Sequence, residues 1–271
     1  MTTFAAIYEP LFMREALLAS CLAGATLGYL GIFIVLRRTV FLGAALPQLA
    51  ALGVAGAIVA GVAPVAGALS GALLGTALLS LVPARSRIPP DGVVGIAFAL
   101  ASSLSILLLA GSSQGESHVL QILSGDILGA TSEEISWMAA VFGVAALVHV
   151  VSWKEFLYVS YDAEMAETLG LRVRFWDGLL FFTIGASVAI SLRVGGAIVS
   201  FAFLVGPASA ALLFSRSLRT IVVLAVLFGV LAAAAGLTLS FRYDLPSGPT
   251  IAACAFFPVF LASILAHQRR D

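Results

Sequence analysis

Apolar runs about 20 residues long follow one another along this chain, separated by short polar segments. A helix that crosses the hydrocarbon core of a bilayer needs about 20 mostly apolar residues, and it satisfies its own backbone hydrogen bonds where no water is present. Of the 271 residues, 61% are hydrophobic and 10% are charged, whereas soluble domains carry about 25% charged residues. The sequence therefore predicts an all-α, polytopic integral membrane helix bundle that forms a single domain over residues 1–271.

About nine of these runs are long enough to be candidate transmembrane helices. They span residues 11–36, 41–62, 64–84, 92–111, 135–152, 176–193, 195–214, 220–241 and 248–267. Residues 118–130 are too short to cross and are expected to lie at the membrane surface or to dip into it. The run GALSGALLGTALL at 67–79 repeats small residues every four positions, which predicts close helix packing.

The basic residues predict the orientation of the bundle, because loops that stay in the cytoplasm carry an excess of lysine and arginine. With nine crossings, eleven of the 14 Lys and Arg residues fall on the side of the C-terminus, and the remaining three fall on the other side. We therefore expect an outside N-terminus and a cytoplasmic C-terminus. The formal net charge of zero argues against nucleic acid as a partner.

Nothing in the sequence indicates that this chain is itself an enzyme. It has no G-x-x-x-x-G-K-[ST] loop, so the usual phosphate-binding route to ATP hydrolysis is missing, and any ATP-driven work needs a separate ATPase subunit. No cofactor is expected on this chain. Cys21 and Cys254 lie far apart in different apolar runs, which argues against a disulfide or a thiolate metal site.

The longest polar segment on the predicted cytoplasmic side is KEFLYVSYDAEMAETLGLRVRFWDG, residues 154–178. Asp162, Ala166 and Gly170 are four residues apart, which predicts that they share one face of a short helix at about 157–171. Two interpretations fit such a helix: docking into a groove on a soluble partner, or lying at the lipid headgroups. Its acidic first half favours docking.

Several motifs resemble the permease subunits of zinc, manganese and iron ABC importers. Asp162-x-x-x-Ala166-x-x-x-Gly170 is similar to the coupling segment of such permeases, and the similarity covers nearly the whole chain. Five further matches, in the order of the family, are FMREALLAS at 12–20, GIFIVLRRTVFLG at 31–43, SGDIL at 124–128, VGGAIVSFAFLVGPASAALL at 194–213 and SFRYDLPSGPTI at 240–251.

The resemblance implies the permease subunit of an ATP-driven importer in a bacterial inner membrane, which carries zinc, manganese or iron by alternating access. It also implies a set of partners: cytoplasmic ABC ATPase subunits, a second permease copy in a homodimer or a related heterodimer, an extracytoplasmic solute-binding protein and the lipid bilayer. The coupling helix around Asp162, Ala166 and Gly170 would transmit the movement of the ATPase to the membrane core.

Residues 41–53, FLGAALPQLAALG, depart from the family where the resemblance implies a contact with the metal ion. The family usually continues from F-L-G with D-A-L-S-H, whereas here the Asp position holds Ala44, the Ser position Pro47 and the His position Gln48. The amide of Gln48 is a weaker ligand for a transition metal than a carboxylate or an imidazole. We keep these three residues as translocation-path candidates, with the metal ligands unknown. Three consequences stay open: a bare ion with ligands from elsewhere, a chelated metal or other small solute, or ligands from a second permease.

Four other residues are weaker candidates. Glu116, His118 and Asp126 could form an outer-face cluster that contacts the binding protein or the entering solute, although surface solvation is the simpler interpretation. His149 could line an exit, but a buried neutral histidine bonded to a neighbouring helix is the favoured interpretation.

A secondary carrier and a non-transporting membrane scaffold are the rival functions. A secondary carrier needs intramembrane carboxylates for coupling, and the apolar runs have no Asp or Glu near their middles.

Overall fold

The structure, a computed structural model, describes residues 8–80, 89–110, 125 and 127–268, and all regular structure within these residues is helical. This confirms the predicted all-α membrane fold. The helices are α2 (Leu11–Leu36), α3 (Val40–Ala60), α4 (Pro64–Ser80), α5 (Pro90–Ala110), the 3₁₀ turn η1 (Ile127–Gly129), α7 (Ser132–Val151), α8 (Trp153–Tyr161), α9 (Ala163–Thr168), α10 (Val173–Phe214), α11 (Leu218–Tyr243) and α12 (Ser247–Gln268).

The predicted count of about nine transmembrane helices is not confirmed. Within the described residues, seven helices are long and apolar enough to cross a membrane. Helix α4 has only 17 residues, and the runs predicted at 176–193 and 195–214 form one helical stretch, α10, of 42 residues. A straight helix of that length would measure about 63 Å, roughly twice the hydrocarbon core. Helix α10 is not straight, because Gly196 has non-helical angles (φ 72°, ψ 177°) that divide it into two halves.

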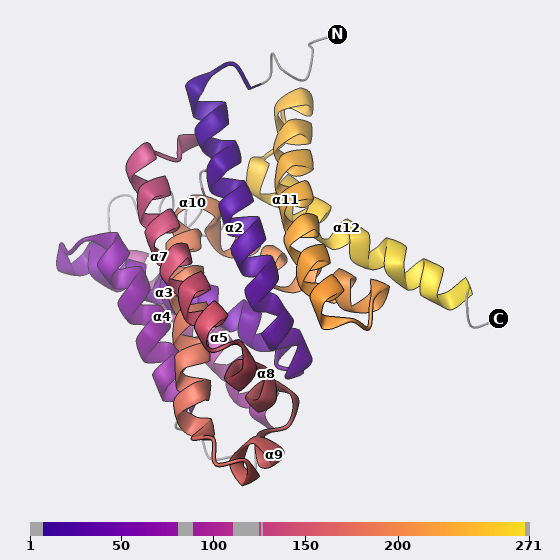
Figure 1. Ribbon diagram of the computed structural model, residues 1–271. Coiled ribbons are helices and arrows are strands. Elements are labelled where there is room, and N and C mark those ends of the chain that lie inside the picture. The colour runs from indigo at the N-terminus through magenta and orange to yellow at the C-terminus, as the bar shows by residue number, and fades with distance from the viewer. Residues whose placement is uncertain (1–7, 81–88, 111–124, 126, 269–271) are drawn as a thin grey trace.

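Helix α10 is the centre of the bundle and packs against α2, α3, α4, α11 and α12 (Figure 1). Small residues let these helices approach closely. A methyl group added at Gly31 of α2 would overlap the carbonyl oxygen of Leu204 in α10, and one added at Gly24 would lie 2.5 Å from the carbonyl oxygen of Gly229 in α11. Helices α8 and α9 lie together at one end of the bundle, called here the α8/α9 end.

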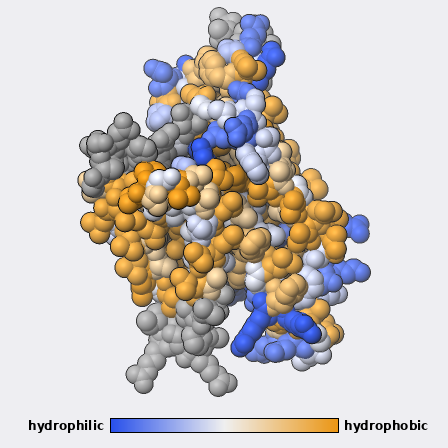
Figure 2. Space-filling view, turned by 90° about the vertical axis from the view of Figure 1, so that its left-hand side faces the viewer, coloured by the Kyte–Doolittle hydropathy of each residue, from blue (hydrophilic) through white to orange (hydrophobic). Residues whose placement is uncertain are grey.

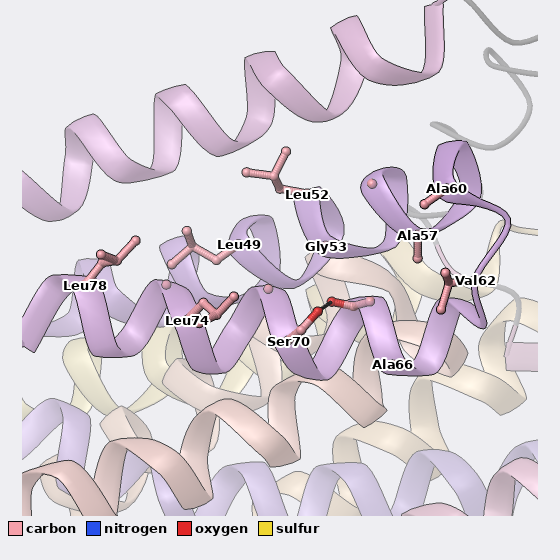
Figure 3. A pocket seen from close by; sticks show the side chains of 14 residues that line it. Leu49, Leu52, Gly53, Ala57, Ala60, Val62, Ala66, Ser70, Leu74 and Leu78 are labelled. Carbon is pink, nitrogen blue, oxygen red and sulfur yellow. Dashed lines mark hydrogen bonds between the residues drawn. The ribbon is translucent and has the colours of Figure 1, made fainter.

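The predicted tight packing of residues 67–79 is confirmed. Gly67 and Gly71 of α4 lie against backbone atoms of α3, and Gly75 packs on the side chain of Leu49. On its outer side, the α3/α4 pair forms an open apolar groove of about 600 Å³ (Figure 3). The hydroxyl of Ser70 in this groove donates to the carbonyl oxygen of Gly67, 3.0 Å away. The groove therefore presents an apolar surface despite this hydroxyl.

The exterior is that of a protein that spans a membrane several times. Figure 2 shows hydrophobic residues across the middle of one face, with most of the hydrophilic residues gathered above and below. Helices α5, α7 and α12 are the least buried of the seven long apolar helices. Their exposed side chains are large and apolar, for example Leu107 of α5, Leu147 of α7 and Phe260 of α12. Such a surface is stable in lipid and unstable in water.

Candidate functional site

Helix α3 carries the three predicted translocation-path residues, and it continues through Pro47 from Val40 to Ala60. Proline has no backbone N–H, so this helix lacks the hydrogen bond that would end on the carbonyl oxygen of Gly43. Gly43 lies directly against α10, because a methyl group there would come 3.2 Å from the side chains of both Leu204 and Val205. Pro47 therefore weakens the backbone of α3 one turn beyond its contact with α10 and does not interrupt the helix.

Gln48 is buried in this helix without a partner for its amide. Its side chain is 9% exposed, and it makes no hydrogen bond to another residue in the described part of the chain. The predicted alternative, a hydrogen bond to a neighbouring helix, is therefore not observed there. The amide atoms are not among the fully buried polar atoms without a hydrogen bond in the described part of the chain, so they keep some accessible surface. Polar side chains inside a membrane bundle usually face a neighbouring helix or a cavity.

The face of α3 that carries Gln48 points toward α5. Phe41, Ala44 and Gln48 follow one another at positions i, i+3 and i+7, which places them on one side of the helix. The ring of Phe41 packs on the ring of Phe98 in α5, with 6.1 Å between their centroids. Helix α5 is the least buried of the long helices, so the end of α3 at Phe41 packs on a peripheral helix.

The break in α10 lies two residues from the point where the sequence predicted the end of one run, 176–193, and the start of the next, 195–214. Backbone atoms of Gly125, which has a φ of 70°, lie against the peptide between Gly195 and Gly196. Beside the break, the hydroxyl of Ser200 donates to the carbonyl oxygen of Gly196 (2.8 Å), and Oγ of Ser191 lies 3.3 Å from Oγ of Ser200. The break at Gly196 therefore lies inside the bundle, with the buried hydroxyls of Ser191 and Ser200 next to it.

This group of hydroxyls extends one turn along α10. Ser187 is fully buried, and its Oγ has no hydrogen-bond partner in the described part of the chain. The sequence offered one signal for this group of hydroxyls, the spacing of Ser187 and Ser191 by one helical turn. Serine is too common in apolar helices for this spacing to predict a functional site. The predicted outer-face residues Glu116, His118 and Asp126 lie outside the described residues.

The predicted coupling helix over 157–171 is two helices, α8 and α9, separated by Asp162. This residue has extended angles (φ −153°, ψ 99°), and its Oδ1 accepts a hydrogen bond from the backbone N–H of Met165 at 2.9 Å, so it caps the start of α9. Gly170 lies beyond the end of α9 with a φ of 82°. The prediction that Asp162, Ala166 and Gly170 share one helix face is therefore wrong. The side chain of Asp162 bonds to the backbone as an N-cap, and of the three residues only Ala166 lies within a helix.

Helix α9 is exposed on nearly all sides. Ala166 is its one buried residue, and the acidic side chains of Glu164 and Glu167 point to solvent. Such a short, capped and exposed helix at the end of the bundle suits contact with a separate subunit.

His149 confirms the favoured interpretation of a buried histidine bonded to neighbouring helices. Its side chain is 1% exposed; Nε2 lies 2.9 Å from Oγ1 of Thr183 in α10, and Nδ1 lies 3.1 Å from Oη of Tyr29 in α2. Thr183 donates its one proton to the carbonyl oxygen of Leu180. It must therefore accept from Nε2–H, which leaves Nδ1 to accept from Tyr29. This geometry assigns His149 to packing, with the proton on Nε2.

No group of three or more His, Cys, Asp or Glu side chains that could hold a metal ion occurs among the described residues.

The comparisons with known proteins define the class of this chain. Residues 9–266 match the model of the ABC 3 transport family, and the chain belongs to that family of ABC transporter permeases. One curated relative is the manganese transport system membrane protein MntC of Listeria innocua, which is 30% identical over 95% of this chain and 92% of its own length. Another is a probable iron transport system membrane protein of Haemophilus influenzae, which is 27% identical over 89% of this chain and 85% of its own length.

A solved structure has the same fold along nearly the whole chain. It is a chain of the PsaBC complex from Streptococcus pneumoniae, bound to Fab, and it superposes with a TM-score of 0.85 at 25% identity, covering 95% of this chain and 93% of that one.

Proposed function

We propose that this chain is the membrane-spanning permease subunit of an ATP-driven importer and forms the path of a divalent transition metal ion by alternating access. The observation that carries the proposal is the 30% identity to a manganese transport membrane protein over 95% of this chain. The relative from Haemophilus influenzae extends the candidate ions to iron, whereas zinc rests on the sequence resemblance alone. The chain is a transport component rather than an enzyme, and a separate ABC ATPase subunit hydrolyses the ATP.

The proposed assembly contains a cytoplasmic ABC ATPase, an extracytoplasmic solute-binding protein and a second permease copy, in a homodimer or a related heterodimer. Membership of the ABC 3 transport family supports the first two partners. The exposed apolar surface of α5 and the apolar groove of α3 and α4 support a second permease copy or lipid beside them.

The proposed topology places the α8/α9 end in the cytoplasm of a bacterial cell, with the N-terminus outside and the C-terminus inside. The distribution of Lys and Arg supports this orientation. The break at Gly196 supports counting α10 as two crossings, and these two crossings, α4 and the six other long helices give nine. Cysteines placed before α2 and tested with a membrane-impermeant thiol reagent report the side of the N-terminus, and labelling from the cytoplasm only would contradict this topology.

We further propose that Ala44, Pro47 and Gln48 line the path of the solute. Gln48 supports this assignment because it is 9% exposed and its amide has no hydrogen bond in the described part of the chain. Because neither Ala44 nor Gln48 supplies a charged ligand, the ion would be held by groups from the second permease or from the binding protein. The same observation favours a chelated metal as a second candidate substrate, since an amide and apolar side chains suit a neutral or shielded solute.

Accumulation of metal in cells tests the proposed substrate class. Cells that express the whole transporter are expected to accumulate manganese or iron from micromolar concentrations, as measured by elemental analysis, while cells without this chain do not. If uptake appears only when a chelator is supplied with the metal, the chelated substrate replaces the bare ion. Equal accumulation with and without this chain under both conditions would contradict both substrates.

The N-cap of α9 is expected to affect binding of the ATPase. Asp162→Ala removes the acceptor for the N–H of Met165, which costs about 1 kcal/mol of helix stability. Because a short helix docks in its folded form, we expect the affinity for the ATPase to fall about fivefold. Asp162→Asn is the matched control, since asparagine caps equally well. Titration of the purified subunits measures the affinity, and equal weakening by both variants would show that the charge, not the cap, matters.

A further inference from the structure

Arg37 lies where α2 ends, and its side chain joins three elements that are far apart in the sequence. Its Nε donates a hydrogen bond to Oγ of Ser160 in α8 (3.1 Å), and its Nη1 lies 2.6 Å from Oδ1 of Asp177 in α10. The guanidinium also lies over the ring of Phe181 in α10, 5.2 Å from the ring centroid. One cation therefore connects α2, α8 and α10 at the α8/α9 end.

The ion pair of Arg37 and Asp177 is partly shielded from solvent. The two side chains are 12% and 33% exposed. Nη2 of Arg37 and Oδ1 of Asp177 are both buried, and neither makes a hydrogen bond in the described part of the chain. The contact between Nη1 of Arg37 and Oδ1 of Asp177 has the distance of an ion pair without the angles of a hydrogen bond. Removing either partner would leave the other charge without its partner in a partly shielded position, where an ion pair has a larger effect than on the open surface.

Aromatic contacts hold the same three elements together deeper in the bundle. Phe156 of α8 is fully buried, and its ring centroid lies 6.3 Å from that of Phe33 in α2 and 5.8 Å from that of Trp176 in α10. The ring of His149 in α7 also packs on Phe156, at 4.5 Å. Helix α8 is therefore fixed to α2 and α10 at two levels, whereas α9 exposes almost all of its side chains.

A continuous series of contacts leads from this unit to the proposed solute path. Gly31, in the last third of α2, packs on the backbone of Leu204 in the second half of α10. The side chain of Leu204 in turn lies against Gly43 of α3, one residue before Ala44. A movement of α2 and α10 relative to α3 would therefore change the surroundings of Ala44 and Gln48.

We propose that Arg37 is a positioning residue that makes α2, α8 and the first half of α10 one rigid unit, so that the movement of an ATPase docked on α9 reaches the helices around the solute path. This inference rests on the proposed function. If Arg37 is removed, α8 can tilt relative to α2 and α10, and ATP hydrolysis continues while less of the movement reaches the membrane core.

The test measures transport and ATP hydrolysis in the same proteoliposomes, which contain the complete transporter, Mn²⁺ and ATP. Arg37→Gln and Asp177→Asn are each expected to lower the number of Mn²⁺ ions moved per ATP hydrolysed about tenfold, a typical coupling effect, while the ATPase stays bound. The double variant is expected to be no worse than either single one, because the pair acts as a unit. Arg38→Gln is the matched control: Arg38 is the exposed neighbour and is expected to leave the ratio unchanged.

Each other outcome overturns the inference in a recognisable way. A lower melting temperature with an unchanged ratio in the Arg37 and Asp177 variants would assign the pair to stability alone. The ratio of Mn²⁺ moved to ATP hydrolysed could fall equally in Arg37→Gln and Arg38→Gln, or the losses of the two single variants could multiply in the double variant. Either result would show that Arg37 and Asp177 do not act as a unit. If Arg37→Gln does not assemble, Asp177→Asn and Ser160→Ala test the inference in its place. A wild-type number of Mn²⁺ ions moved per ATP hydrolysed in both variants would overturn the inference. Absence of ATP-driven Mn²⁺ transport by the wild type would overturn the proposed function and, with it, this inference.

Discussion

Gly31→Ala is expected to destabilise the bundle strongly, a large effect for a single methyl group. The added methyl would overlap the carbonyl oxygen of Leu204, which belongs to the backbone of α10 and cannot move away as a side chain does. Helices α2 and α10 would have to separate, which disrupts the main core at a buried contact. Overpacking costs about 1–3 kcal/mol and more where backbone atoms clash. We therefore expect a fall in melting temperature of about 10 °C, or loss of folded protein from detergent extracts.

Gly56→Ala is the matched control for this prediction. Gly56 is also inside a transmembrane helix, α3, but a methyl group there meets nothing within 4 Å. Alanine is the better helix former by about 1 kcal/mol, so this variant is expected to equal or exceed the stability of the wild type. A Gly31→Ala protein that melts at the temperature of the Gly56→Ala protein would contradict the close approach of α2 and α10.

Ala44→Asp combined with Gln48→His is expected to raise the affinity of the transporter for Mn²⁺ or Zn²⁺ at least tenfold, in line with the effects of single groups around metal sites. The two positions lie one turn apart on one face of α3, a spacing at which helical side chains can bind one ion together. A carboxylate supplies charge and an imidazole supplies a nitrogen ligand, which the present alanine and glutamine do not. Metal binding to the purified complex, followed by calorimetry, measures this change.

The control for this pair uses the same spacing about two turns further along α3. Leu52→Asp with Gly56→His places an identical pair in the apolar groove of α3 and α4. This control is expected to leave the metal affinity at the wild-type value. If both pairs raise the affinity equally, or neither does, the segment of α3 around Gln48 is not the path of the solute.

The sequence predicted the long helices well because each depends on a local property, an uninterrupted apolar run. Helix α2 has the predicted bounds, 11–36, and the observed ends of α12 lie within one residue of the predicted ends. The two halves of α10 were predicted as two separate runs, 176–193 and 195–214, but the helical stretch continues on both sides of Gly196 without a polar loop. Hydropathy cannot distinguish a kink from a loop when the residues at the kink are themselves apolar.

The contacts that join distant segments could not be predicted. Arg37 and Asp177 are 140 positions apart, and neither residue carries a local signal for the other. The prediction that Asp162, Ala166 and Gly170 share one helix face was wrong because a local signal was present but was misinterpreted. Spacing alone suggested a helix, whereas the side chain of Asp162 stabilises the start of a helix better than its interior.

The candidate solute path was identified in the sequence because it departs from its family at three polar positions, those held here by Ala44, Pro47 and Gln48. The structure adds that Gln48 is 9% exposed and that its amide has no hydrogen bond in the described part of the chain, which no property of FLGAALPQLAALG could reveal. The burial of His149 between Tyr29 and Thr183 likewise depends on three separate helices, and only its apolar surroundings were evident from the sequence.

ATP-driven uptake of Mn²⁺ into proteoliposomes tests the central claim most directly. The vesicles contain this chain, its ATPase and the solute-binding protein, with ATP enclosed on the side of the ATPase. We expect ⁵⁴Mn²⁺ to enter and move against its gradient only when ATP is present and hydrolysable, and uptake to stop when this chain is omitted. Uptake that is driven by an ion gradient without ATP, or that is unchanged in vesicles lacking this chain, would contradict the assignment of a permease subunit of an ATP-driven metal importer.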